Sequence, residues 1–107
     1  MRSLFYVDES ATSLTMLALG GNMMTLDRAL LTLDAIANKL FAKLSSDGIG
    51  FSHDHDRGEA VFTIMTDQAD SLVAWVNHDW FHGCCIKVVV NGNPTFALYC
   101  ANALRGE

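Results

Sequence analysis

The chain has 107 residues, of which 50% are hydrophobic and 18% are charged. This balance excludes an intrinsically disordered chain, which would contain few apolar residues, and the length predicts a single domain. Seven basic and twelve acidic side chains give a net charge of −5. Direct binding to nucleic acid, which requires a basic surface, is therefore not expected.

The sequence also indicates where the protein works. It contains three cysteines, which is an odd number and too few for a small secreted fold held by disulfides. The apolar run 4–7 ends at Asp8, too soon for the core of a signal peptide. A bilayer span needs about 20 consecutive apolar residues, and no such stretch is present. We therefore expect a cytoplasmic protein with reduced thiols and no membrane association.

The first half of the chain predicts strands followed by one long helix. Residues 2–7 favour a strand, whereas 13–19 fit either a strand or a helix. Thr25 is a suitable N-cap, and the segment 45–48 ends the helix. Apolar side chains recur every three or four residues between these limits, as expected for one buried helix face: Leu26, Ala29, Leu30, Leu33, Ile36, Ala37, Leu40 and Leu44.

The apolar surface of this helix is wider than one stripe, because Leu31 and Phe41 lie on its flank. The extra width predicts a second packing partner, either inside the domain or in another subunit. We expect a homodimer formed through part of this helix or its flank.

The second half predicts two hairpins and a shorter helix. Residues 49–53 and 60–65 fit the strands of the first hairpin. A helix is expected to begin at Thr66 or Asp67 and to stop at Gly83. The second hairpin pairs 84–90 with 95–100, and 104–107 are expected to fray. The predicted fold class is a two-layer α+β fold, an antiparallel sheet with one long and one shorter amphipathic helix on one face.

One stretch of the chain concentrates the side chains that could bind a metal. If 66–82 is helical, the four-residue spacing of His78 and His82 places them on one face, whereas His53 and His55 share a face of a strand. With Cys84 they could form a metal site. The alternative is that these are ordinary polar residues at element ends. No zinc-ribbon spacing or helical metalloprotease motif is present, so no metal, cofactor or catalytic residue is assigned.

The neighbouring cysteines and carboxylates do not complete a reaction centre. Cys84 and Cys85 are adjacent on a predicted strand and point to opposite sides, which does not suit a redox pair. Asp54 and Asp56 are expected on the face opposite His53 and His55, in solvent. No nucleophile, base and oxyanion hole occur together. We therefore predict a protein that is not an enzyme.

Aromatic side chains suggest binding instead. Trp75, His78 and His82 would share one face of the second predicted helix, and Phe81 would lie beside it. Aromatic residues outside the core are frequent anchors of binding surfaces, although Trp75 and Phe81 could equally complete the core edge. The residues predicted to bind a partner are Leu31, Phe41, Trp75, His78, Phe81 and His82.

Two classes of function fit these features. The first is a small non-catalytic module that binds and inhibits another protein, and the second is a small-ligand or metal-binding protein, or an enzyme, that uses the histidines and cysteines of 53–85. Surplus apolar surface favours the first class.

The size, acidity, Leu and Met content, and the apolar width of helix 26–44 are similar to those of the QslA-type quorum-sensing antiactivators. This resemblance lies in overall layout, not in a motif. It implies binding to the ligand-binding domain of a LuxR-type transcription regulator, which would block dimerisation and DNA binding. A phage-encoded inhibitor fits the same features.

Overall fold

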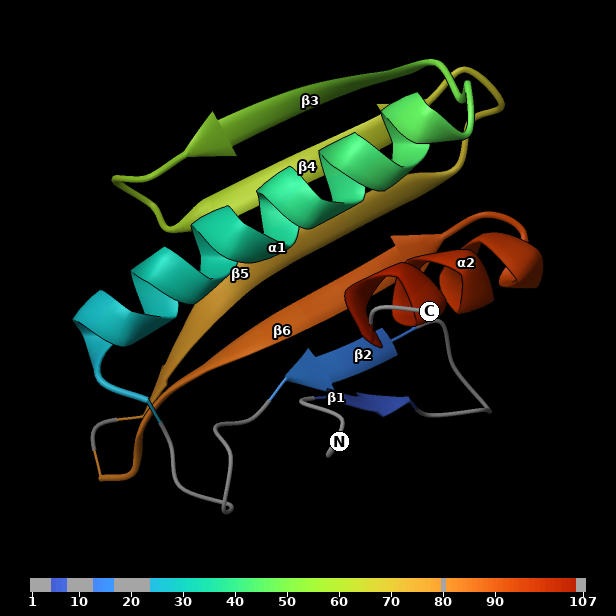
Figure 1. Cartoon of the computed structure of the whole chain (residues 1–107). Coiled ribbons are helices and arrows are strands. Elements are labelled where there is room, and N and C mark those ends of the chain that lie inside the picture. Colours follow the sequence, from blue (N-terminus) through green and yellow to red (C-terminus); the bar gives the residue numbers. More distant parts are fainter. Residues whose placement is uncertain (1–4, 8–12, 17–23, 80, 106–107) are drawn as a thin grey trace.

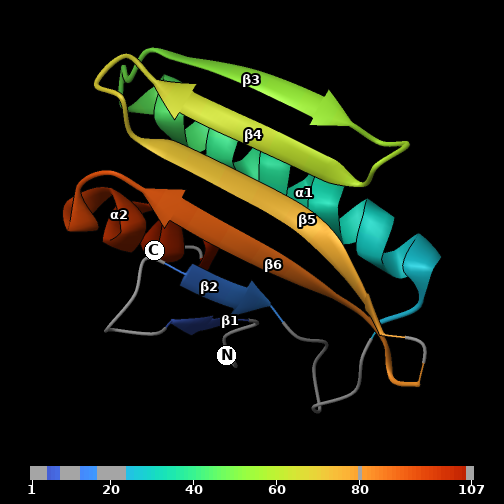
Figure 2. The same ribbon diagram turned by 180° about the vertical axis from the view of Figure 1, so that it is seen from behind.

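The computed structural model describes residues 5–7, 13–16, 24–79 and 81–105. The six strands form one antiparallel sheet in the order β1-β2-β6-β5-β4-β3, and both helices lie on one face of it (Figure 1). Seen from behind, the opposite face of the sheet carries no helix from the described residues (Figure 2). This arrangement confirms the predicted two-layer α+β class. The elements in chain order are β1 (Phe5–Val7), β2 (Ser13–Met16), α1 (Leu26–Ser46), β3 (Phe51–Asp56), β4 (Val61–Thr66), β5 (Ser71–Asp79), β6 (Gly83–Asn91) and α2 (Pro94–Arg105).

The first two elements answer the question left open for 13–19. Residues 13–16 form strand β2, which pairs with β1 on one side and with β6 on the other. The strand alternative is therefore right, and residues 17–19 lie outside the described part of the chain.

Helix α1 begins and ends close to the predicted residues. Thr25 is its N-cap, and its hydroxyl oxygen accepts a hydrogen bond from the Arg28 amide at 3.3 Å. The predicted stripe is buried along most of its length. The prediction is wrong for Leu26, the first residue of the stripe, whose side chain is 47% exposed. Met24, which lies just before the N-cap, is part of the core instead.

The predicted second helix is wrong, because Ser71–Asp79 is strand β5. Leu72 and Ala74 are fully buried under the helices, whereas Val73 and Trp75 between them are half-buried on the other face. A short apolar run fits both periodicities, and the β-branched and aromatic residues of this segment favour the strand. Pairing with β4 on one side and β6 on the other satisfies its backbone along most of its length.

The predicted strand 95–100 is also wrong, because the chain forms helix α2 from Pro94 to Arg105. Proline suits the first helical position, since its missing N–H would have no partner there. The side-chain oxygen of Asn93 accepts a hydrogen bond from the Thr95 amide at 2.9 Å, as an N-cap does. Asn93 and Pro94, which lie between the two predicted hairpin strands, thus start a helix.

Helix α2 also corrects the expectation of a frayed end at 104–105, because its last turn is held against α1, whereas 106–107 lie outside the described residues. Leu104 is buried, and its carbonyl oxygen accepts a hydrogen bond from Lys39 Nζ at 3.2 Å. At the other end of the helix pair, Tyr99 donates its hydroxyl proton to Asp47 Oδ2 at 2.6 Å. The two helices therefore cover the sheet as a connected layer over one hydrophobic core.

Candidate functional site

The most distinctive surface feature lies where β5 turns into β6. These strands pair continuously from Ser71 opposite Asn91 to Asp79 opposite Gly83, which makes a long hairpin. We call its end, Asp79 with residues 81–83, the hairpin tip. Trp80 lies outside the described residues.

A single carboxylate organises the hairpin tip. Asp79 Oδ1 accepts hydrogen bonds from the amides of Phe81 at 2.8 Å and His82 at 3.3 Å. Its second oxygen lies 3.0 Å from Nδ1 of the His82 ring. The backbone hydrogen bond from Phe81 and the side-chain hydrogen bond from His82 lower the pKa of Asp79. The carboxylate is therefore charged at neutral pH and closes the turn as an Asx-type cap.

The turn presents a large apolar ring to solvent. Phe81 is 93% exposed, the highest value among the exposed large hydrophobic side chains of the described residues. The Asp79 hydrogen bonds hold the backbone on which this ring sits. A ring kept outside the core on an ordered backbone loses little freedom when it enters a partner's pocket, which is the property of a binding anchor.

The start of α1 lies beside this tip. Met24 and Cys84 exchange backbone hydrogen bonds at 2.9 and 2.8 Å, and both views show the first turn of α1 and the β5–β6 turn at the same end of the molecule (Figures 1 and 2). The exposed Leu26 therefore belongs to the same end of the molecule. The sequence analysis missed it, because the helical periodicity placed Leu26 in the core.

The six predicted partner-binding residues do not form one patch. Only Phe81 and His82 lie together at the hairpin tip, and His78 lies next to it, opposite Cys84. Trp75 belongs to the sheet face that no helix covers. The prediction that Trp75, His78 and His82 share a helix face is wrong, because that helix does not exist.

The two residues predicted on the flank of α1 have different environments. Leu31 is 64% exposed. Phe41 packs inside the fold, with its ring centroid 5.5 Å from that of Phe51 and 4.3 Å from that of His53. Of these two flank residues, only Leu31 is exposed, because Phe41 packs against the edge strand β3. The exposed apolar surface of α1 is therefore smaller than predicted.

The histidines are held in two separate places. His53 stacks against Phe41, and His55 Nε2 lies 3.3 Å from Asp34 Oδ1 on α1. His78 and His82 lie at the hairpin end, where His78 Nδ1 is 3.7 Å from Cys84 Sγ. Across residues 5–7, 13–16, 24–79 and 81–105, no three His, Cys, Asp or Glu side chains converge on a point where a metal could bind.

The cysteines behave as small core residues. Cys84 belongs to the main core, whereas its neighbour Cys85 is buried outside that core, so the two side chains point apart as predicted. Burial raises the pKa of Cys84, and it raises the pKa of Cys100 to about 12. Both thiols therefore stay protonated at neutral and mildly alkaline pH.

This burial predicts unreactive thiols. All three cysteines are free and buried, and the thiolate is the reactive form. With Ellman's reagent at about pH 8, far below the raised pKa of Cys100, the folded protein is expected to react slowly. Unfolding in urea should release all three thiols at once. Rapid reaction of one thiol in the folded state would contradict the assignment and point to an activated cysteine.

The uncovered face of the sheet is the second notable surface. We call the outward-facing side chains of β3–β6 the open face. They include Ser52, Asp54, Asp56, Val61, Thr63, Met65, Ser71, Val73, Trp75, Lys87, Val89 and Asn91.

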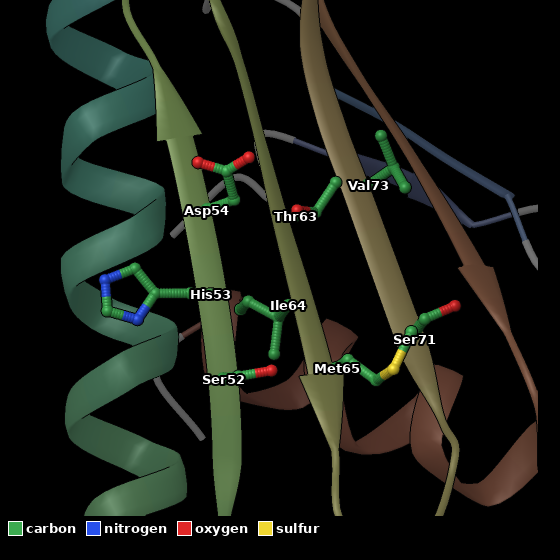
Figure 3. A pocket seen from close by; sticks show the side chains of 8 residues that line it. All are labelled: Ser52, His53, Asp54, Thr63, Ile64, Met65, Ser71 and Val73. Carbon is green, nitrogen blue, oxygen red and sulfur yellow. The ribbon is translucent and has the colours of Figure 1, made fainter.

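The structure confirms that Asp54 and Asp56 lie on the face opposite His53 and His55. An open hollow of about 360 Å³ lies over β3, β4 and β5, and Figure 3 shows the side chains around it, with His53 directed toward α1. Its outward-facing lining mixes Asp54 and two serines with Thr63, Met65 and Val73.

Comparisons with protein-family models, with curated proteins and with solved structures find no match for this chain. Within the described part, neither helix combines the length and the apolar character required to cross a bilayer.

Proposed function

We propose that the chain is a small non-catalytic protein-interaction module, which binds another protein through the hairpin tip and inhibits it. The observation that carries the proposal is the 93% exposure of Phe81 on a turn that Asp79 holds closed. Large aromatic side chains that project from the surface are frequent anchors and contribute much of the affinity of protein–protein interfaces.

The surroundings of Phe81 define the chemistry of the partner. Leu26, at the start of α1, exposes a second apolar side chain at the same end of the molecule, and His82 with Asp79 supplies a polar rim. The chain as a whole is acidic, with a net charge of −5, which favours a partner surface with basic residues around an apolar pocket. We infer a folded partner that offers such a pocket.

The proposal includes inhibition of a transcriptional activator. It rests on the similarity in size, acidity and layout to quorum-sensing antiactivators. The expected action is occupation of a LuxR-type regulator's ligand-binding domain, which would prevent its dimerisation. Adding the protein to such a regulator and its operator DNA should then abolish the shifted DNA band in a mobility-shift assay.

The binding role is tested by parallel affinity capture from lysate of the source cells, followed by mass spectrometry. The baits are the unaltered protein, Phe81→Ala and Leu98→Ala. Leu98 is a matched control because it is 57% exposed but lies on α2. A protein retained by the unaltered bait and Leu98→Ala, and lost with Phe81→Ala, supports the proposal. Identical capture by all three baits would refute it.

A further inference from the structure

The open face has a repeating order that is visible in the strand register. Asp56, Val61, Trp75 and Lys87 lie in one row across β3, β4, β5 and β6. The next row contains Asp54, Thr63, Val73 and Val89, and the third contains Ser52, Met65, Ser71 and Asn91. Each row therefore has one residue on each of the four strands.

The first and the third of these rows are complementary to themselves. A two-fold axis that runs along the strands between β4 and β5 exchanges β3 with β6 and β4 with β5, and keeps each row at the same height. The axis therefore places Asp56 of one copy over Lys87 of another, and the reverse contact forms by symmetry.

Side-chain sizes match in the same way. Trp75 of one copy would lie over the smaller Val61 of the other. In the third row Met65, which is 57% exposed, would lie over Ser71. Large side chains thus meet small ones, as packing of two sheets at about 10 Å separation requires.

Charge supports the same pairing. Among the described residues no ion pair is recorded for Lys87 or Asp56, whereas Asp34 and Asp47 have basic partners. Lys87 lies among half-buried side chains on the open face, next to Trp75 in its row. A partner's carboxylate over Lys87 would pair this lysine, whereas the same axis places Asp54 of one copy over the uncharged Val89 of the other.

We infer that two copies of this chain associate face to face through the open faces of β3–β6, with Asp56 of each copy paired to Lys87 of the other. The three rows span five residues on each of the four strands, which at about 4.8 Å spacing and about 3.3 Å per residue is roughly 300 Å² of flat area per copy. Two copies together would cover about 600 Å², which is below the roughly 1,000 Å² of stable specific interfaces. The dimer is therefore expected to be weak and reversible.

This interface replaces the helix flank as the expected dimer surface. Phe41, which motivated the flank, is packed against Phe51 and His53. The open face also leaves the hairpin tip outside the contact rows. The dimer and the proposed partner binding are therefore separate properties, and a failure of one does not imply a failure of the other.

The test is a charge exchange measured by sedimentation equilibrium between about 1 and about 200 µM, a range that covers weak interfaces of this size. Lys87→Asp and Asp56→Lys should each weaken association at least about tenfold through like-charge contacts. The double variant restores both pairs and should associate within about threefold of the unaltered protein. Far-ultraviolet circular dichroism shows whether each variant is folded.

Two further variants keep the test decisive if a charge variant is unstable. Met65→Lys places a charge in the third contact row of the open face at an exposed position and should abolish the dimer. Leu31→Lys places the same charge on the outer face of α1 at a similarly exposed position, and should leave it intact. A monomer at every concentration would overturn the inference, as would a dimer that Leu31→Lys breaks and Met65→Lys does not.

Discussion

Replacing Leu72 by Ala is expected to lower the free energy of unfolding by about 3 kcal/mol, whereas Val73→Ala should lower it by less than about 1 kcal/mol. Leu72 is 0% exposed between β5 and the helices. Deleting its three outer carbons leaves a cavity that the packed core cannot close. Val73 is half-buried on the open face, so water fills the space left by its truncation.

This pair of variants distinguishes the strand from a helix over the same residues. In a helix, Leu72 and Val73 would both belong to the apolar face and both truncations would be costly. The measurement is urea unfolding followed by tryptophan fluorescence, at a concentration low enough to keep the chain monomeric. Equal losses for the two variants would contradict strand β5.

The second large effect concerns partner binding. Once the captured protein is purified, Phe81→Ala should weaken its binding by about 2 kcal/mol, or roughly thirtyfold in Kd. The free energy of unfolding should stay almost unchanged, because the ring is 93% exposed. Isothermal titration calorimetry gives the first quantity and urea unfolding gives the second.

Two variants of Asp79 test whether the hydrogen-bonded turn that carries the Phe81 ring contributes to binding. Asp79→Asn keeps a side-chain oxygen that can accept the hydrogen bonds from the Phe81 and His82 amides, so it should bind nearly as well as the unaltered protein. Asp79→Ala removes that oxygen and should bind more weakly. Equal affinities for Asp79→Asn and Asp79→Ala would show that an ordered turn does not contribute.

The sequence predicts the fold class and α1 well, since 21 helical residues contain enough turns to define one periodicity. Prediction of secondary structure from the sequence fails where an apolar run is short. The spacing of Leu72, Val73 and Val76 fits a helix, but β5 satisfies its backbone with strands on both sides, which is a tertiary effect. Asn93-Pro94 fits both a turn and a helix start. Only the burial of α2 against α1 decides between them.

The candidate site shows the same limit. Phe81 and His82 could be named from the sequence because aromatic and polar residues cluster there. The role of Asp79 depends on the hairpin geometry, and the place of Leu26 depends on the bridge between Met24 and Cys84. The open face was not foreseen, because a helix in place of β5 removes the alternation that defines it.

The most direct test of the hairpin tip as the binding surface is amide hydrogen exchange of the chain alone and in complex with the captured protein. The account predicts new protection at residues 78–83 and at the first turn of α1, with the C-terminal half of α1 unchanged. Protection confined to α2 or to the C-terminal half of α1, with the hairpin tip exchanging as in the free chain, would contradict it.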